Sequence, residues 1–120
     1  MSIAGIGVDV VDLKRFERAV GRTPLLRQRL FAESERDLPL RSLAGRFAAK
    51  EALMKALGES ESVTWHDMVV ISNAEGNPSL VLSGAAAEIA QRQGITRIHL
   101  SMSHDAGVAI AQVVIEKADA

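Results

Sequence analysis

Apolar residues alternate with small or acidic ones along residues 3–11, with a period of two. One side of this segment carries Ile6, Val8 and Val10. The other side carries Gly5, Gly7 and Asp9. This alternation predicts a β-strand whose Asp9 points away from the strand's apolar face.

Short helices are predicted next. Helical spacing begins at Leu13 and ends at Gly21, a residue type that commonly stops helices. Thr23 and Pro24 have the chemistry of an N-cap and of a first helical position, so we expect a second short helix there. Ser34, followed by acidic residues, is expected to cap a further turn.

The longest predicted helix runs from Leu40 to Leu57 and stops at Gly58. Its apolar residues fall on one stripe at about 100° per residue; they are Leu43, Phe47, Met54 and Leu57. Lys50 lies almost in the middle of this stripe. Glu51 and Lys55, four residues apart, share a neighbouring face.

The second half of the chain alternates strand and helix patterns. Strands are expected over residues 67–72 and 79–83 as a hairpin, then a helix over 84–93, a strand through Ile98, Leu100 and Met102, a turn over 104–107 and a last strand over 108–116. With 120 residues and no internal repeat, residues 1–120 are expected to form a single domain. The predicted fold class is α+β, with a mainly antiparallel sheet packed against the long central helix.

The composition limits the kinds of core, binding surface and metal site that the chain can form. Aromatic residues supply only 3% of the chain, which predicts a core of Ala, Val, Ile, Leu and Met and argues against a stacking surface for nucleic acid. The chain has no cysteine, so a metal would need carboxylate, imidazole or water ligands. No apolar stretch reaches the roughly 20 residues of a membrane span, and no signal peptide pattern is present, so we expect a cytoplasmic protein.

Charge is unevenly distributed although the net charge is only -1. The segment from Lys14 to Arg29 holds six basic residues and one acid, Glu17. Such a segment fits an acidic partner, and it also fits an ordinary solvated helix face.

Three places combine residue types that can support catalysis. Asp9 interrupts an apolar strand beside small residues, Glu51 and Lys55 put a carboxylate and an ammonium on one helix face, and His104 ends a strand before a tight turn. The structural alternatives are an exposed strand aspartate, an ordinary Glu–Lys helix pair beside a snorkelling Lys50, and a hydrogen-bonding histidine. A serine hydrolase is not expected, because no nucleophile elbow is present.

Together these places resemble one family, the holo-acyl-carrier-protein synthase group of 4'-phosphopantetheinyl transferases. The matching motifs are GIGVDVVDLKRF, RFAAKEALMKALG and SMSHDAGVAIAQVV. Their order and spacing match over essentially the whole chain, and the central motif is the most specific. The resemblance implies the transferase-like fold of that family and a homotrimer with active sites between subunits.

The resemblance also implies roles for individual residues. Asp9 and Glu51 would be the metal ligands, for Mg²⁺, with Lys55 beside them as the third catalytic residue. Coenzyme A would be held by Arg46, Lys50 and His104. Arg15 and Arg22 would bind the acidic carrier protein. Asp105 departs from the family, where many members have a hydroxyl residue after the histidine.

The implied reaction transfers 4'-phosphopantetheine from coenzyme A to a serine of an acyl carrier protein, as in fatty acid biosynthesis. Glu51 or a metal-bound water would accept the serine proton. Three alternatives stay open at this point: a non-catalytic module that binds coenzyme A or a nucleotide, an oligomeric scaffold, and a metal-dependent pyrophosphohydrolase.

Overall fold

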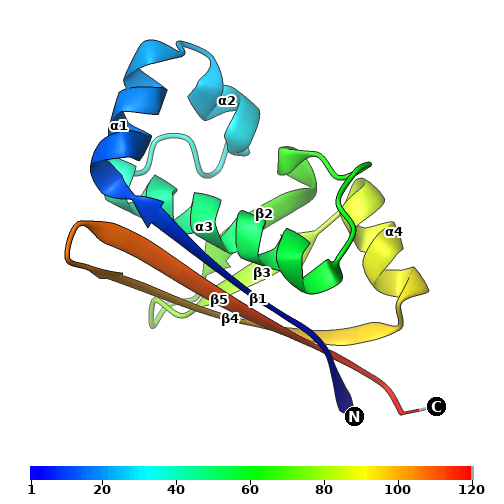
Figure 1. Cartoon of the computed structure of the whole chain (residues 1–120). Helices are drawn as coiled ribbons and strands as arrows, with labels where there is room; N and C mark the ends of the chain where they lie inside the picture. Colours follow the sequence, from blue (N-terminus) through cyan, green and yellow to red (C-terminus); the bar gives the residue numbers. More distant parts are fainter. Residues whose placement is uncertain (120) are drawn as a thin grey trace.

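A single long helix, α3 (Leu40–Leu57), lies across one face of a three-stranded antiparallel sheet (Figure 1). The sheet has the order β1-β5-β4, formed by Ser2–Asp12, Val108–Lys117 and Ile95–Asp105. This computed structural model describes residues 1–119. The predicted α+β class, with an antiparallel sheet against the central helix, is therefore confirmed.

The remaining elements are short. They are α1 (Leu13–Arg22), α2 (Leu26–Leu30), the 3-10 helix η1 (Trp65–Asp67), the hairpin β2 (Met68–Ser72) and β3 (Pro78–Leu82), and α4 (Gly84–Arg92). α1 and α2 sit together at one end of α3, and α4 lies near the other end (Figure 1). The hairpin forms its own two-stranded sheet, with β3 beside β4.

Two local predictions were wrong. The second short helix starts at Leu26 rather than at Pro24, because the Thr23 amide still donates to Ala19 O and closes α1. β4 extends through His104 to Asp105, so the turn consists only of Ala106 and Gly107, whose φ angles of 51° and 79° are both left-handed.

Two glycines lie on the side of β1 that faces α3. At Gly5 and Gly7 an added Cβ would overlap the carbonyl oxygens of Ala56 and Ala52 on α3, so only glycine allows the strand to approach the helix this closely. The opposite side carries the apolar residues predicted for it, which are 51–58% exposed: Ile6, Val8 and Val10. Asp9 points away from them, as predicted.

Small side chains fill the space between α3 and the sheet. Alanines on α3 meet the inward face of β5, where Val113 and Ile115 are fully buried. Two charged side chains, Glu35 and Lys50, are also buried in the interior. Over residues 1–119, no helix has the length and hydropathy needed to cross a membrane.

The close contact between β1 and α3 predicts a large effect of one methyl group. Gly7→Ala should lower the free energy of unfolding by about 3 kcal/mol, because strand and helix must separate to admit the Cβ. Gly21→Ala is the matched control: nothing lies within 4 Å of its added Cβ, and in α1 the substitution should stabilise by about 0.5–1 kcal/mol. Urea unfolding of both variants measures the difference, and equal stabilities would contradict the packing described.

Candidate active site

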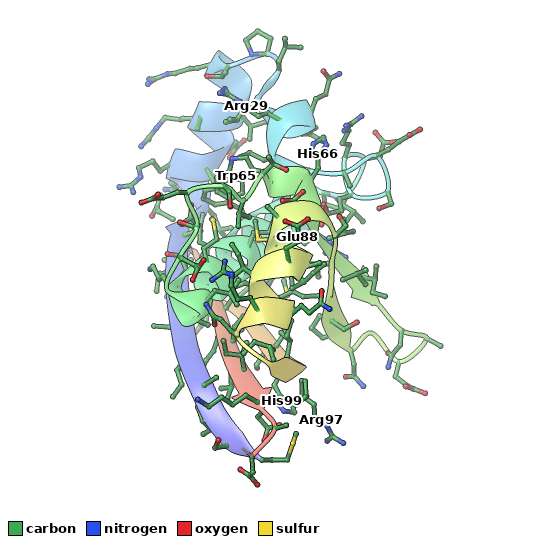
Figure 2. The ribbon with its side chains drawn as sticks, turned by 90° about the vertical axis from the view of Figure 1, so that its right-hand side faces the viewer. Arg29, Trp65, His66, Glu88, Arg97 and His99 are labelled. Carbon is green, nitrogen blue, oxygen red and sulfur yellow. The ribbon has the colours of Figure 1, made fainter. Side chains whose placement is uncertain are left out.

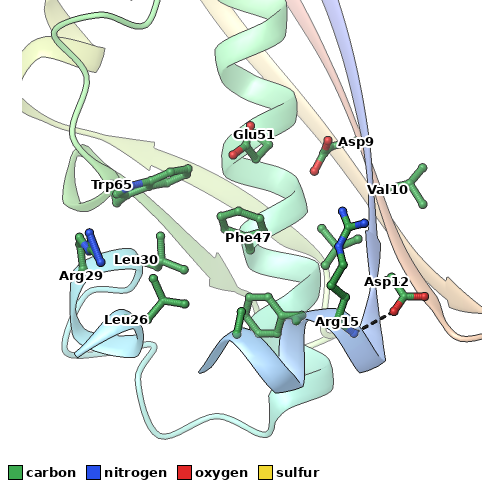
Figure 3. Close-up of a pocket in the computed structure, with 13 residues that line it drawn as sticks. Asp9, Val10, Asp12, Arg15, Leu26, Arg29, Leu30, Phe47, Glu51 and Trp65 are labelled. Carbon is green, nitrogen blue, oxygen red and sulfur yellow. Dashed lines mark hydrogen bonds between the residues drawn. The ribbon is translucent and has the colours of Figure 1, made fainter. Parts of the chain in front are cut away.

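β1 and α3 bring three charged groups together. The Lys55 ammonium donates to Asp9 Oδ1 at 2.9 Å and to the Val8 carbonyl at 3.0 Å. Glu51 lies one turn earlier on α3, on the face that borders β1 (Figure 3). The predicted trio of Asp9, Glu51 and Lys55, distant in sequence, is thus close in space.

Burial and the neighbouring charges change the ionisation of Glu51. Burial raises the pKa of Glu51 above its ordinary value, and the negative charge of Asp9 raises it further, whereas Lys55 acts in the opposite direction. Glu51 is half-buried and the Asp9 side chain is only 17% exposed. Bringing a cation to this pair would relieve the repulsion that raises the pKa of Glu51.

A pocket of about 570 Å³ opens from these carboxylates toward α1 and α2 (Figure 3). Its polar residues are Asp9, Asp12, Arg15, Arg29 and Glu51, and its large apolar residues are Phe16, Leu26, Leu30, Phe47 and Trp65. The pocket is therefore lined by both charged and apolar side chains.

Aromatic rings form much of the apolar lining of the pocket. The Phe47 ring lies 5.7 Å from Phe16 and 5.4 Å from Trp65, measured between ring centroids. These are three of the four aromatic residues in the chain. The few aromatic residues thus pack into one part of the core, and three of them line the pocket.

A second hollow, of about 400 Å³, lies on the other side of Glu51. It is lined by Glu51, Met54, Lys55 and residues 58–61. Glu51 therefore separates two spaces, and a ligand with two ends could pass it and occupy both. Arg92 fixes the rim of the second hollow, because its guanidinium donates to both Glu59 carboxylate oxygens, at 2.7 and 3.3 Å.

One basic residue of α1 lines the first pocket, and others lie along the same helix. Asp12 begins this helix, its carboxylate accepting a hydrogen bond from the Arg15 amide at 2.8 Å. The exposed Arg15 side chain lines the pocket, whereas Arg22 is exposed at the far end of the helix. Both predicted partner-binding residues thus lie on one helix that leads to the pocket.

Two of the residues expected to hold coenzyme A do not reach this pocket within one chain. His104 lies on β4, on the other side of β5 from Asp9, and its Nε2 is 2.9 Å from the Arg41 carbonyl oxygen. Arg46 turns toward Glu35, with its Nε 3.9 Å from Glu35 Oε2. Their roles in binding remain predictions.

The structure places Lys50 in the interior of the chain, away from the pocket. Its side chain is fully buried, and its ammonium donates to Glu35 Oε1 at 2.7 Å and to the Leu30 carbonyl at 2.8 Å. Lys50 does not line the pocket in this arrangement, and its role in binding coenzyme A stays a prediction. The position of Lys50 in the apolar stripe of α3 was the sign that it would be buried.

Sequence reasoning missed several residues of the site. Trp65 and Arg29 line the pocket, and Glu35 holds the buried lysine. A lone tryptophan in a polar loop is a detectable signal for Trp65. Glu35, by contrast, stands among other charged residues and cannot be distinguished from a solvated acid by pattern.

Known proteins match this chain over nearly its full length. A model of the 4'-phosphopantetheinyl transferase superfamily matches residues 5–112. The chain is similar to a holo-[acyl-carrier-protein] synthase of Leifsonia xyli subsp. xyli, with 62% identity over 115 residues that cover 96% of this chain and 98% of that protein.

Solved structures agree with this match. The fold is similar to that of holo-[acyl-carrier-protein] synthase from Neisseria meningitidis, with a TM-score of 0.88, 35% identity and coverage of 96% of this chain and 99% of that one. It is also similar to the Helicobacter pylori enzyme in complex with coenzyme A, with a TM-score of 0.81, 34% identity and coverage of 92% and 99%. Because the superfamily model matches residues 5–112 and a relative is 62% identical, the chain belongs to the 4'-phosphopantetheinyl transferase superfamily.

Proposed function

We propose that this chain is a transferase that moves 4'-phosphopantetheine from coenzyme A to a serine of an acyl carrier protein, supplying fatty acid biosynthesis. One observation carries the proposal: the convergence of Asp9, Glu51 and Lys55 where two hollows meet, in a chain whose relatives are named for this reaction. The whole chain acts as one transferase domain in the cytoplasm.

The reaction exchanges one phosphorus–oxygen bond for another. The serine Oγ bonds to the phosphorus nearest the pantetheine arm, the bond from that phosphorus to the bridging oxygen breaks, and adenosine 3',5'-bisphosphate leaves. Lys55 supplies a positive charge where negative charge grows on the phosphate oxygens. Glu51 accepts the serine proton directly or through a bound water.

The donor set beside Lys55 fits Mg²⁺. Asp9 and Glu51 offer carboxylate oxygens, the ligands that this hard cation prefers, and water and phosphate oxygens would complete its coordination. Among residues 1–119 no group of three or more His, Asp or Glu side chains is arranged to hold a metal, so the proposed site relies on these two carboxylates. When bound, the cation would polarise the phosphorus and neutralise the leaving group.

A trimer would complete the site. The outward side of β1 exposes Ile6, Val8 and Val10 in a row, an apolar surface that a second copy can bury. His104 and Arg46 lie away from the carboxylates of their own chain. In the proposed homotrimer, these side chains approach the coenzyme A that is bound at a neighbouring copy's carboxylates.

Removing either carboxylate tests the catalytic assignment. Asp9→Ala and Glu51→Ala should each reduce transfer by on the order of 10²- to 10³-fold or more, because the phosphate charge loses its compensating cation. Intact mass of an apo acyl carrier protein, after incubation with coenzyme A and Mg²⁺, measures the added phosphopantetheine. Chelator should abolish the gain, and Glu88→Ala, an exposed acid on α4, serves as the matched control (Figure 2). Full activity of either carboxylate variant would refute this metal site.

The apolar side of β1 predicts the oligomeric state. Val8→Glu should dissociate the trimer. Burying an apolar side chain there contributes about 1.5–3 kcal/mol per copy to association, and a carboxylate in its place would be buried without a partner. Light scattering after size exclusion gives the mass, and transfer should fall together with it. Val81→Glu, similarly exposed at 49% on the hairpin, should leave the mass unchanged. A wild-type protein that is active as a monomer would contradict the trimer.

The basic face of α1 predicts a salt-dependent partner. Arg22→Glu should raise the KM for the carrier protein about tenfold at low salt and leave the KM for coenzyme A unchanged, since Arg22 is exposed and outside the pocket. Arg15→Glu should act in the same direction, and both effects should shrink as ionic strength rises. Arg97→Glu, on β4, reverses a charge away from α1 and provides the control. An unchanged carrier KM in both α1 variants would exclude this docking face.

A further inference from the structure

The buried ion pair of Glu35 and Lys50 links three separate parts of the chain. Glu35 Oε1 accepts hydrogen bonds from Lys50 on α3 and from the Ala32 amide at 3.0 Å. Its Oε2 accepts from the Val70 amide of β2 at 3.1 Å. One carboxylate, 1% exposed, thereby joins α3, β2 and the segment that follows α2.

Lys50 extends this link to α2 itself. Its ammonium donates to the Leu30 carbonyl, the last residue of α2, and lies 5.0 Å from the centre of the Phe31 ring. Burial lowers the pKa of Lys50, while the hydrogen bond and charge of Glu35 act in the opposite direction. Glu35 therefore offsets the cost of burying an ammonium at this place.

α2 needs such an anchor because it is short and forms a wall of the pocket. It has five residues and no side-chain cap, and Leu26, Arg29 and Leu30 line the pocket. Two further side-chain contacts hold α2: Arg27 Nη1 donates to the Arg36 carbonyl at 3.0 Å, and the Gln28 carbonyl oxygen lies 2.7 Å from His66 Nε2. Figure 2 shows His66 and Trp65 of η1 beside Arg29.

We infer that Lys50 and Glu35 are positioning residues that fix the α2 wall of the pocket and act on the substrate without touching it. The inference rests on the proposed function only for its kinetic readout. The reacting groups Asp9, Glu51 and Lys55 make no hydrogen bond to this pair. Loosening the wall should therefore weaken binding and leave the chemical step largely intact.

A purely structural role is the competing explanation. Buried ion pairs can often be replaced without loss of stability, whereas removing one partner leaves an uncompensated charge and is strongly destabilising. A single substitution therefore changes both the stability of the protein and the position of α2, and its kinetic effect cannot be assigned to either one. A double substitution can separate them, because it removes the stranded charge but does not restore the bond to the Leu30 carbonyl.

The experiment compares Lys50→Met with the double variant Lys50→Met/Glu35→Gln. Lys50→Met should lower the unfolding midpoint and speed amide exchange of residues 26–31 on the order of 10- to 100-fold. It should also raise the KM for coenzyme A or the carrier about tenfold, while kcat stays within about twofold of the wild-type value. The double variant should regain much of the midpoint and keep the fast exchange and the high KM. Ile115→Val, a core change on β5, should lower the midpoint with both KM values unchanged.

Two results would overturn the inference. One is a double variant whose exchange and KM return to wild-type values together with its midpoint, which would reduce the pair to a stabilising role. The other is wild-type exchange over residues 26–31 in Lys50→Met. A wild-type protein that transfers nothing to any carrier would instead count against the proposed function, and the exchange measurement would still decide the role of the pair.

Discussion

The approach of β1 to α3 without intervening side chains is the constraint on which the site depends. Gly5 and Gly7 let the strand lie directly against the helix carbonyls of Ala56 and Ala52. Asp9, the next residue on that side, is thereby brought within 2.9 Å of the Lys55 ammonium and beside Glu51. The same packing directs the apolar residues of β1 outward, so one feature accounts for both the charged cluster and the exposed apolar surface.

The pocket wall depends on a different kind of contact. α2 is held by two of its backbone carbonyls, one accepting from the buried Lys50 and the other close to His66. Side-chain packing contributes as well, because Leu30 is buried in the core and Leu26 packs against it, but a five-residue helix offers few side chains to pack. Polar contacts to the backbone fix the position of such a segment while leaving its own side chains, Leu26, Arg29 and Leu30, free to line the pocket.

The sequence predicted the elements well because their periodicity is clear. The helix over Leu40–Leu57 and the strands around it follow from spacing alone, and Gly58 ends the helix in the left-handed conformation expected for a stop. The orientation of β1 was harder, since alternation shows two sides without saying which one meets the core. The Glu35–Lys50 pair could not be predicted, because an acid that will be buried has the same local pattern as an acid in solvent. Contacts between residues distant in sequence decide which side of β1 meets the core and whether Glu35 is buried, and local spacing does not reveal such contacts.

β1 is an edge strand. Its ladder partner β5 is the middle strand of the sheet and follows the other strands in sequence, with Ser2 paired to Lys117 and Asp9 to Ala111. Asp9 and its ladder partner Ala111 therefore lie far apart in the sequence. Until β5 is available for pairing, β1 has no ladder to join, and the carboxylate of Asp9 has no fixed position. Loop closure across almost the whole chain must precede assembly of the site, which places this small protein among those whose folding is slowed by non-local pairing.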